Sequence, residues 1–178
     1  MTAMMEEILI EPTEEWLPEA AAYKRAFEAA GDSMDGCGSL RRHANPADWL
    51  AYNRILSDPA TVPPHWVPST QYVCVRKADG RIVGMIQLRH RFNDYLERYG
   101  GHIGYSVRPD ERRKGYAAWM LARMLETCRA RGMKRVLVTC LAENEASRRT
   151  ILANGGRYES TVHEPAENVD LERYWIEL

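Results

Sequence analysis

The chain has no apolar run long enough to span a bilayer, and its start, Met-Thr-Ala-Met-Met-Glu-Glu, lacks the basic and apolar regions of a secretory signal. It also lacks a basic surplus, because 24 Lys and Arg residues stand against 25 Asp and Glu residues. General affinity for nucleic acid requires such a surplus. We therefore expect a cytoplasmic protein with neither a membrane nor a nucleic acid as its partner.

Paired cysteines and clustered histidines are absent as well. The four cysteines show no C-x-x-C spacing, and none of the five histidines stands at metal-ligand spacing from another His or a Cys. Cys74 and Cys140 lie in strand-like apolar runs, and Cys128 lies on the apolar stripe of a long helix-like segment. The pattern predicts buried free thiols, which suit a reducing compartment, and no metal site.

Repeats, heptad arrays, low-complexity tracts and linkers are also missing. A length of 178 residues with 45% hydrophobic residues is enough to bury a stable core without disulfides or bound metals. These observations predict one domain over residues 1–178.

Hydrophobic periodicity predicts the element order β-α-α-β-β-β-α-β-α-β-β. The expected strands are 8–10, 71–76, 81–88, 101–107, 135–140, 158–163 and 174–178. The expected helices are 14–30, with Thr13 as N-cap, 47–56, with Asn45 as N-cap, 117–131 and 144–154, and a short helix or turn at 93–99. Glycine and polar residues make 31–45 an expected mobile loop. Helix 117–131 between two strands predicts a right-handed β-α-β unit whose strands are parallel.

The most informative segment lies where strand 101–107 leads into helix 117–131. It contains Arg112, Arg113 and Lys114 followed by Gly115. The first turn of a helix has amide groups without internal partners, and the helix dipole favours an anion there. Gly115 lacks the Cβ that would keep an anion away from the backbone. The segment therefore predicts a pyrophosphate site, and the alternative is a basic turn on a solvated helix.

The spacing Arg112-x-x-Gly115-x-Ala117 resembles the acetyl-coenzyme A signature of the GNAT acetyltransferase superfamily. Further similarities are the run 100–105, the strand 137–140, and Asn144-x-x-Ser147 before a Gly-Gly turn. The run 101–158 is most similar to a bacterial subfamily of unassigned substrate. The resemblance implies an α/β (α+β) fold of one domain, with a mixed central sheet whose parallel strands splay apart and are flanked by helices.

The resemblance also implies a function: transfer of an acetyl group from acetyl-CoA to a primary amine of a small molecule or a peptide by direct attack. The cofactor core would span residues about 100–158. The implied cofactor-binding residues are Val107, Arg112, Arg113, Lys114, Gly115, Tyr116, Ala117, Asn144 and Ser147. A homodimer is one possible assembly. A non-catalytic acyl-CoA-binding module is the first alternative. A nucleic-acid-binding protein that uses Arg41, Arg42 and the cluster 112–114 is the second.

The sequence leaves both the general acid and the general base of the reaction open. Many GNAT enzymes carry a tyrosine acid seven residues after the asparagine, and here that position is Ile151. Tyr105 is the candidate acid, with core packing as the alternative. His102 is the candidate base, because its ordinary pKa is suitable. Strand alternation places His102 on the face of Gly104, opposite Tyr105, which favours a structural histidine.

The acceptor pocket has three candidates just after strand 81–88. Arg89, His90 and Asn93 follow that strand closely and could line the pocket. The alternative for all three is an ordinary surface loop.

Overall fold

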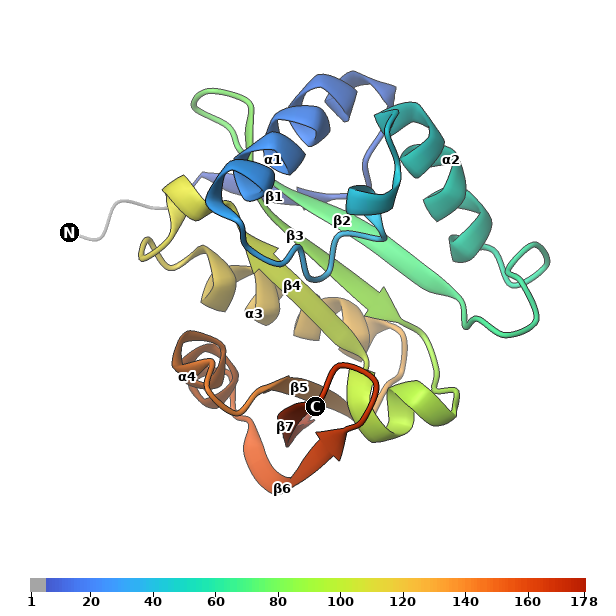
Figure 1. Ribbon diagram of the computed structural model, residues 1–178, viewed down its shortest axis with the longest axis vertical. Helices are drawn as coiled ribbons and strands as arrows, with labels where there is room; N and C mark the ends of the chain where they lie inside the picture. Colours follow the sequence, from blue (N-terminus) through green and yellow to red (C-terminus); the bar gives the residue numbers. More distant parts are fainter. Residues whose placement is uncertain (1–5) are drawn as a thin grey trace.

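One seven-stranded sheet organises the protein, in the order β1-β2-β3-β4-β5-β7-β6 (Figure 1). The computed structural model describes residues 6–178. The strands are β1 (Glu7–Ile10), β2 (Ser69–Arg76), β3 (Arg81–Arg89), β4 (Ile103–Val107), β5 (Arg135–Leu141), β6 (Arg157–Glu164) and β7 (Val169–Glu177). The helices are α1 (Leu17–Ala30), α2 (Pro46–Ser57), α3 (Tyr116–Ala130) and α4 (Glu145–Ala153), with short turns η1 (Glu14–Trp16), η2 (Leu40–Arg42), η3 (Leu96–Gly100) and η4 (Pro109–Glu111).

Helices cover both faces of the sheet and define two apolar cores. Helices α1 and α2 lie on one face, and α3 and α4 lie on the other (Figure 1). Tyr23 and Phe27 of α1 pack on Val73 and Met85 in the first core. The second core is larger and joins the apolar stripe of α3 to β3, β4, β5 and β7. The predicted mixed α/β fold is therefore confirmed, including the parallel pairing of β4 with β5.

Local signals placed most elements correctly. The Asn45 side chain accepts a hydrogen bond from the Ala47 amide at 2.9 Å, as expected of the N-cap of α2. The Asp-Gly turn joins β2 and β3 as an antiparallel hairpin. Thr13 was wrong as a side-chain cap: its hydroxyl donates to the Glu15 carboxylate at 3.1 Å, and the expected helix begins as the 3-10 turn η1.

Residues 31–45 differ from the expected mobile loop. Cys37 and Leu40 are buried in the first core, and η2 shapes the segment. A Cβ on Gly36 would lie 2.2 Å from the Gly104 carbonyl oxygen, so the loop backbone rests directly on β4. The glycines that suggested looseness instead permit this close approach.

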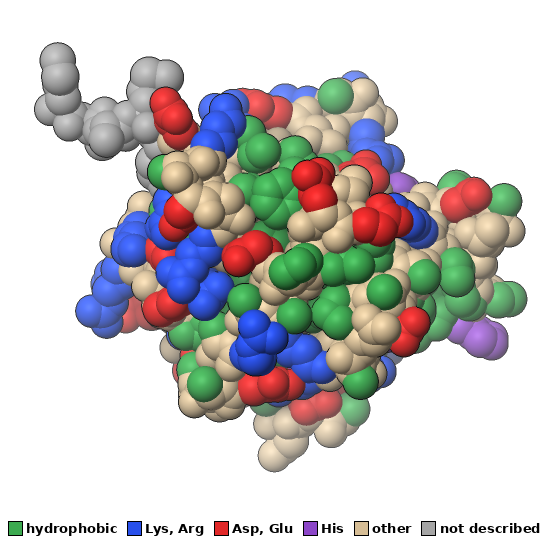
Figure 2. All heavy atoms as spheres, turned by 90° about the horizontal axis from the view of Figure 1, so that it is seen from above, with side chains coloured by type: hydrophobic (Ala, Val, Ile, Leu, Met, Phe, Trp, Pro, Cys, Tyr) green, Lys and Arg blue, Asp and Glu red, His purple; other side chains and the backbone are tan. Residues whose placement is uncertain are grey.

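The predicted chemistry of the thiols is confirmed, since all four cysteines are free and buried. Among residues 6–178, no group of His, Cys, Asp and Glu side chains is arranged to hold a metal ion. No helix in the same range is both long and apolar enough to cross a membrane. On the face covered by α1 and α2, acidic and basic side chains are interspersed (Figure 2).

Candidate functional site

Strands β4 and β5 touch at one end and then part. Ile103 and Val138 are their one aligned pair, and the His102 amide donates to the Leu137 carbonyl at 2.8 Å beside it. On its other side β4 pairs along its whole length with β3, as β5 does with β7. From Gly104 onward, the facing edges of the two parallel strands therefore carry backbone groups without a strand partner.

The segment after β4, from Arg112 to Ala117, forms the turn for which a pyrophosphate site is predicted; it is called the Arg112–Ala117 turn below. Arg113 and Gly115 both have left-handed backbone conformations, with φ of 63° and 86°. Within residues 6–178, no amide from Arg112 to Ala117 donates a hydrogen bond to another group of the chain. A Cβ on Gly115 would meet nothing within 4 Å, so the space in front of the turn is open. Unpaired amides in alternating conformations at the start of a helix are the geometry that the predicted anion site requires.

Two of the three cations in this turn already have partners. Arg112 Nη1 lies 2.8 Å from Asp32 Oδ2, and its guanidinium lies over the Phe27 ring. Lys114 Nζ lies 2.6 Å from Glu111 Oε2, although half of its side chain is exposed. Arg113 is exposed and has no ion pair within residues 6–178. Arg113 and Lys114 thus remain the predicted phosphate contacts. Lys114 would have to leave Glu111 in order to reach a phosphate.

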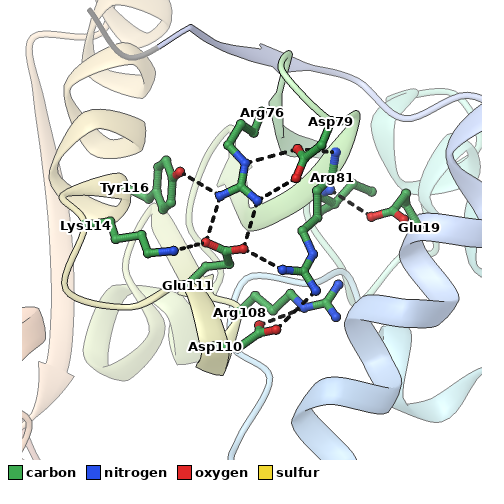
Figure 3. Close-up of polar contacts among 10 residues, drawn as sticks. Glu19, Arg76, Asp79, Arg81, Arg108, Asp110, Glu111, Lys114 and Tyr116 are labelled. Atoms are coloured by element: carbon green, nitrogen blue, oxygen red, sulfur yellow. Dashed lines mark hydrogen bonds and ion pairs between the residues drawn. The ribbon is translucent and has the colours of Figure 1, made fainter. Parts of the chain in front are cut away.

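Glu111 fixes this turn to the β2–β3 hairpin (Figure 3). Its carboxylate is 2% exposed and receives Arg76 Nη1 at 2.8 Å, Arg81 Nη1 at 2.6 Å and Lys114 Nζ at 2.6 Å. Burial raises the pKa of Glu111, but the hydrogen bonds from Arg76, Lys114 and Arg81 outweigh it and lower the pKa to about 2. The carboxylate is therefore ionised under all ordinary conditions.

The structure brings Tyr105 and Ser147 together across the gap between β4 and α4. The Tyr105 hydroxyl lies 2.8 Å from Ser147 Oγ, and the Ser147 amide donates to Asn144 Oδ1 at 3.1 Å, which caps α4. Burial raises the pKa of Tyr105 to about 12, so the phenol keeps its proton. Ile151, where a tyrosine was expected from the resemblance, is fully buried in the second core.

His102 has the contacts of a structural histidine. Its Nδ1 accepts a hydrogen bond from the Leu137 amide at 2.9 Å, which assigns the proton of the neutral ring to Nε2. The ring stacks on Phe92 with centroids 4.0 Å apart. Burial, together with the charge of Arg89, lowers the pKa of His102 to about 4. These contacts favour the structural alternative over the role of a base.

The three candidates for the acceptor pocket do not converge. Arg89 leans over β4 beside Gly104. His90 binds Thr70 Oγ1 through Nε2 at 2.7 Å, and Arg131, at the end of α3, contacts the same hydroxyl. Asn93 accepts from the Leu96 amide at 2.9 Å and donates to the His65 carbonyl at 3.3 Å, which fastens a loop. Arg89 alone lies at the point where β4 and β5 part.

Sequence reasoning missed two groups of residues. Glu111 was hidden because its burial depends on Arg76 and Arg81, which are distant in the chain. The available signal was a pair of acids, Asp110 and Glu111, directly before a basic run. A polar chain also joins α1 and the 31–45 loop to β4, through Ser106 Oγ, which lies 2.9 Å from the Tyr23 hydroxyl and 3.2 Å from Cys37 Sγ. No local pattern signals these long-range contacts.

A model of the Acetyltransferase (GNAT) family matches residues 34–155 of this chain. The match covers most of the 31–45 loop, the parting strands, the Arg112–Ala117 turn and α4. The chain therefore belongs to the GNAT acetyltransferase family, and the protein is an acyltransferase.

Solved structures agree with this fold. The microcin C7 self-immunity acetyltransferase MccE, in complex with acetyl-CoA and AMP, is 17% identical with a TM-score of 0.70, over 97% of this chain and 93% of that one. The RimL ribosomal L7/L12 α-N-protein acetyltransferase, in complex with coenzyme A, is 15% identical with a TM-score of 0.71, over 97% and 94%. The ribosomal-protein-S5-alanine acetyltransferase from Vibrio fischeri is 14% identical with a TM-score of 0.70, over 96% and 92%. No curated protein sequence matches the chain significantly.

Proposed function

We propose that this protein transfers the acetyl group of acetyl-CoA to a primary amine by direct attack. One observation carries the proposal: the parting of β4 from β5 directly precedes a turn of unpaired amides at the start of α3. An extended ligand with a pyrophosphate at one end needs both features. Residues 1–178 act as one domain, and residues about 100–158 form its cofactor core.

The residues present fit such a ligand. The amides from Arg112 to Ala117 would hold the pyrophosphate, with added charge from Arg113 and Lys114. The backbone of β4 from Tyr105 to Val107 would pair with the pantetheine arm, and Asn144 and Ser147 border it from α4. When bound, acetyl-CoA supplies an acetyl thioester, the activated form of the group to be transferred.

The chain's own contribution at the reacting centre is polarisation and positioning. A β4 amide that faces β5 can donate to a carbonyl oxygen as negative charge develops there, an effect worth about 3–4 kcal/mol elsewhere. Tyr105 keeps its proton at neutral pH and can donate a hydrogen bond to a departing sulfur. Its pKa of about 12 makes complete proton transfer to a thiolate unfavourable, because thiols have a pKa near about 8.5. We assign no histidine base.

The acceptor is a small-molecule or peptide amine, and the proposed setting is the cytoplasm. The mixed charges on the face in Figure 2 give no support to binding of nucleic acid. A homodimer is compatible with the proposal and is not needed for the site, since every residue named above belongs to one chain.

The test has two readouts. Acetyl-CoA should raise the melting temperature in proportion to the logarithm of its concentration, and an amine library should release free thiol from it. Absence of any thermal shift at millimolar acetyl-CoA would refute the proposal. Binding without turnover of any amine would favour a second function, a non-catalytic acyl-CoA-binding module, for which Ile151 in place of a tyrosine is the specific observation.

A further inference from the structure

Arg89 places a cation at the point where β4 leaves β5. It is the last residue of β3, and a Cβ added to Gly104 would lie 3.0 Å from Arg89 Nη2 and 3.4 Å from the Gly36 Cα. Gly104 directly follows Ile103, the one residue of β4 aligned with β5. The guanidinium thus lies over the apex of the parting strands, on the face opposite Tyr105.

The charge of Arg89 is not balanced by the chain. Within residues 6–178, its one side-chain hydrogen bond goes from Nη1 to the Gly100 carbonyl at 3.0 Å, and no carboxylate lies at ion-pair distance. Asp35 acts on it from farther away, and its own carboxylate accepts from Ser33 Oγ at 3.3 Å. Burial lowers the pKa of Arg89, with Asp35 and Tyr95 opposing that effect.

Other partly buried arginines of the chain are paired, which makes Arg89 an exception. Arg76 binds Glu111 and Asp79, and Arg148 binds Glu172 at 2.7 Å. A guanidinium offers five donors and stays protonated, so it cannot escape the cost of burial by losing its charge. Arg89 is also partly exposed, and none of its nitrogens is among the fully buried polar atoms of residues 6–178 that lack a partner.

We propose that Arg89 binds an anionic group of the acceptor, so that the substrates are amines that carry a carboxylate or a phosphate close to the reacting nitrogen. The inference rests on the proposed function, because that function places the acetyl group at the apex beside Gly104. A planar guanidinium fork matches both anions in a bidentate manner. Within residues 6–178, Arg89 Nε and Nη2 make no hydrogen bond, so these two donors remain for such an anion.

The experiment compares matched pairs of amines as acceptors. Free L-α-amino acids are assayed against their carboxamides, and O-phosphoethanolamine against ethanolamine, with thiol release from acetyl-CoA as the readout. We expect kcat/KM to favour the anionic member of at least one pair by about 10-fold or more. A preference for amino acids over their carboxamides identifies a carboxylate as the bound group. A preference for O-phosphoethanolamine over ethanolamine identifies a phosphate.

Arg89→Gln should remove this preference. KM for the preferred anionic amine should rise by about 10- to 100-fold, the usual loss for a hydrogen bond to a charged group. Activity toward the neutral counterpart and affinity for acetyl-CoA should stay unchanged. Arg89→Lys keeps the charge without the fork and should give an intermediate preference, and it replaces the Gln variant if that one does not fold. Arg91→Gln, at an exposed neighbouring arginine, is the matched control and should behave as wild type.

Three outcomes would overturn the inference. The wild type could show no preference for anionic amines, or Arg89→Gln could keep that preference. In the third outcome, Arg89→Gln loses kcat/KM equally for both members of a pair. The last would make Arg89 a structural anchor for Gly100. If no amine turns over, the same pairs are compared by thermal shift with coenzyme A bound. A shift by the anionic members that requires Arg89 supports the inference, and its absence overturns it. If acetyl-CoA itself fails to bind, the proposed function is refuted. Thermal shifts measured without coenzyme A then still show whether Arg89 binds the anionic amines.

Discussion

Glu111→Gln removes the negative charge that joins the β2–β3 hairpin to the Arg112–Ala117 turn. The change keeps the size of the side chain and one acceptor oxygen. It leaves the charges of Arg76, Arg81 and Lys114 facing a neutral amide at a site that is 2% exposed in the wild type. Arg76 and Arg81 keep Asp79 and Asp110 as partners, so the fold should persist with lower stability.

The magnitude follows from the pKa of the carboxyl group. A shift from the ordinary 4.5 to about 2 corresponds to about 3 kcal/mol, at about 1.4 kcal/mol for each pKa unit. Loss of one partner from a buried ion pair costs about 3–5 kcal/mol in other proteins. Lys114 is half-exposed and can regain water, and the Gln oxygen keeps some hydrogen bonding. We therefore expect a loss of about 2–3 kcal/mol in the free energy of unfolding at pH 7.

Urea unfolding measures this loss, as a midpoint lower by about 1 M. The pH dependence adds a second check. A carboxyl whose folded pKa is lowered contributes stability that is complete above its unfolded pKa and is lost as the pH falls toward the folded one. The difference between the two proteins should thus be constant from pH 8 to about 5, and should narrow from about 4.5 toward 2.

Glu145→Gln is the matched control. Glu145 Oε1 lies 2.6 Å from Arg149 Nη2, as close as the contacts of Glu111, but both side chains are exposed. Its loss should cost about 0.5 kcal/mol or less. An effect of Glu111→Gln as small as that of the control would refute the reasoning, because it would mean that the three cations gain nothing from the buried carboxylate.

Three further predictions concern the reacting centre. Gly115→Val should reduce the affinity for acetyl-CoA by at least about 10-fold in calorimetry and lower stability by about 1–2 kcal/mol, because φ is 86° there; an unchanged dissociation constant would show that the turn holds no phosphate. Tyr105→Phe should lower kcat and leave the affinity for acetyl-CoA intact, and a loss under about threefold would remove the hydroxyl from catalysis. His102→Gln should keep any titration of kcat/KM near neutral pH, since the pKa of His102 is about 4; loss of that titration would restore it as the base.

Much of this fold could be read from local patterns. The apolar stripe of α3 and the Asp-Gly turn of the hairpin depend on residues close in sequence, so periodicity and turn chemistry reveal them. Asn45 caps α2 as expected, and Asn144 caps α4, because a cap contacts amides two or three residues ahead. Gly115 was singled out by its place before a helix, and its left-handed conformation fits that reasoning.

The contacts between distant segments could not be read in this way. The burial of Glu111 requires a hairpin about 30 residues away, and the packing of the 31–45 loop requires Gly36 to meet Gly104. Composition suggested a mobile loop because glycine occurs both in loose turns and where two backbones approach closely, and composition does not separate the two. The separation of Arg89 from His90 follows strand alternation, but the place of Arg89 beside Gly104 depends on the pairing of β3 with β4, which no local pattern gives.

The sheet has four edges rather than two, because β4 and β5 stay joined at one aligned pair alone. An unpaired edge at the rim of a sheet invites another chain to add to it, and proteins usually guard it with charge or irregularity. Here the two additional edges face each other in the middle of the sheet, with α3 and α4 across one face and the 31–45 loop on the other. The extended ligand proposed above would enter between them lengthwise, while a second protein strand would have to pass the helices. The amides of Gly104 to Val107 that point toward β5 should therefore exchange their hydrogens with water far faster than those of β3, and slow down once a ligand lies between the strands.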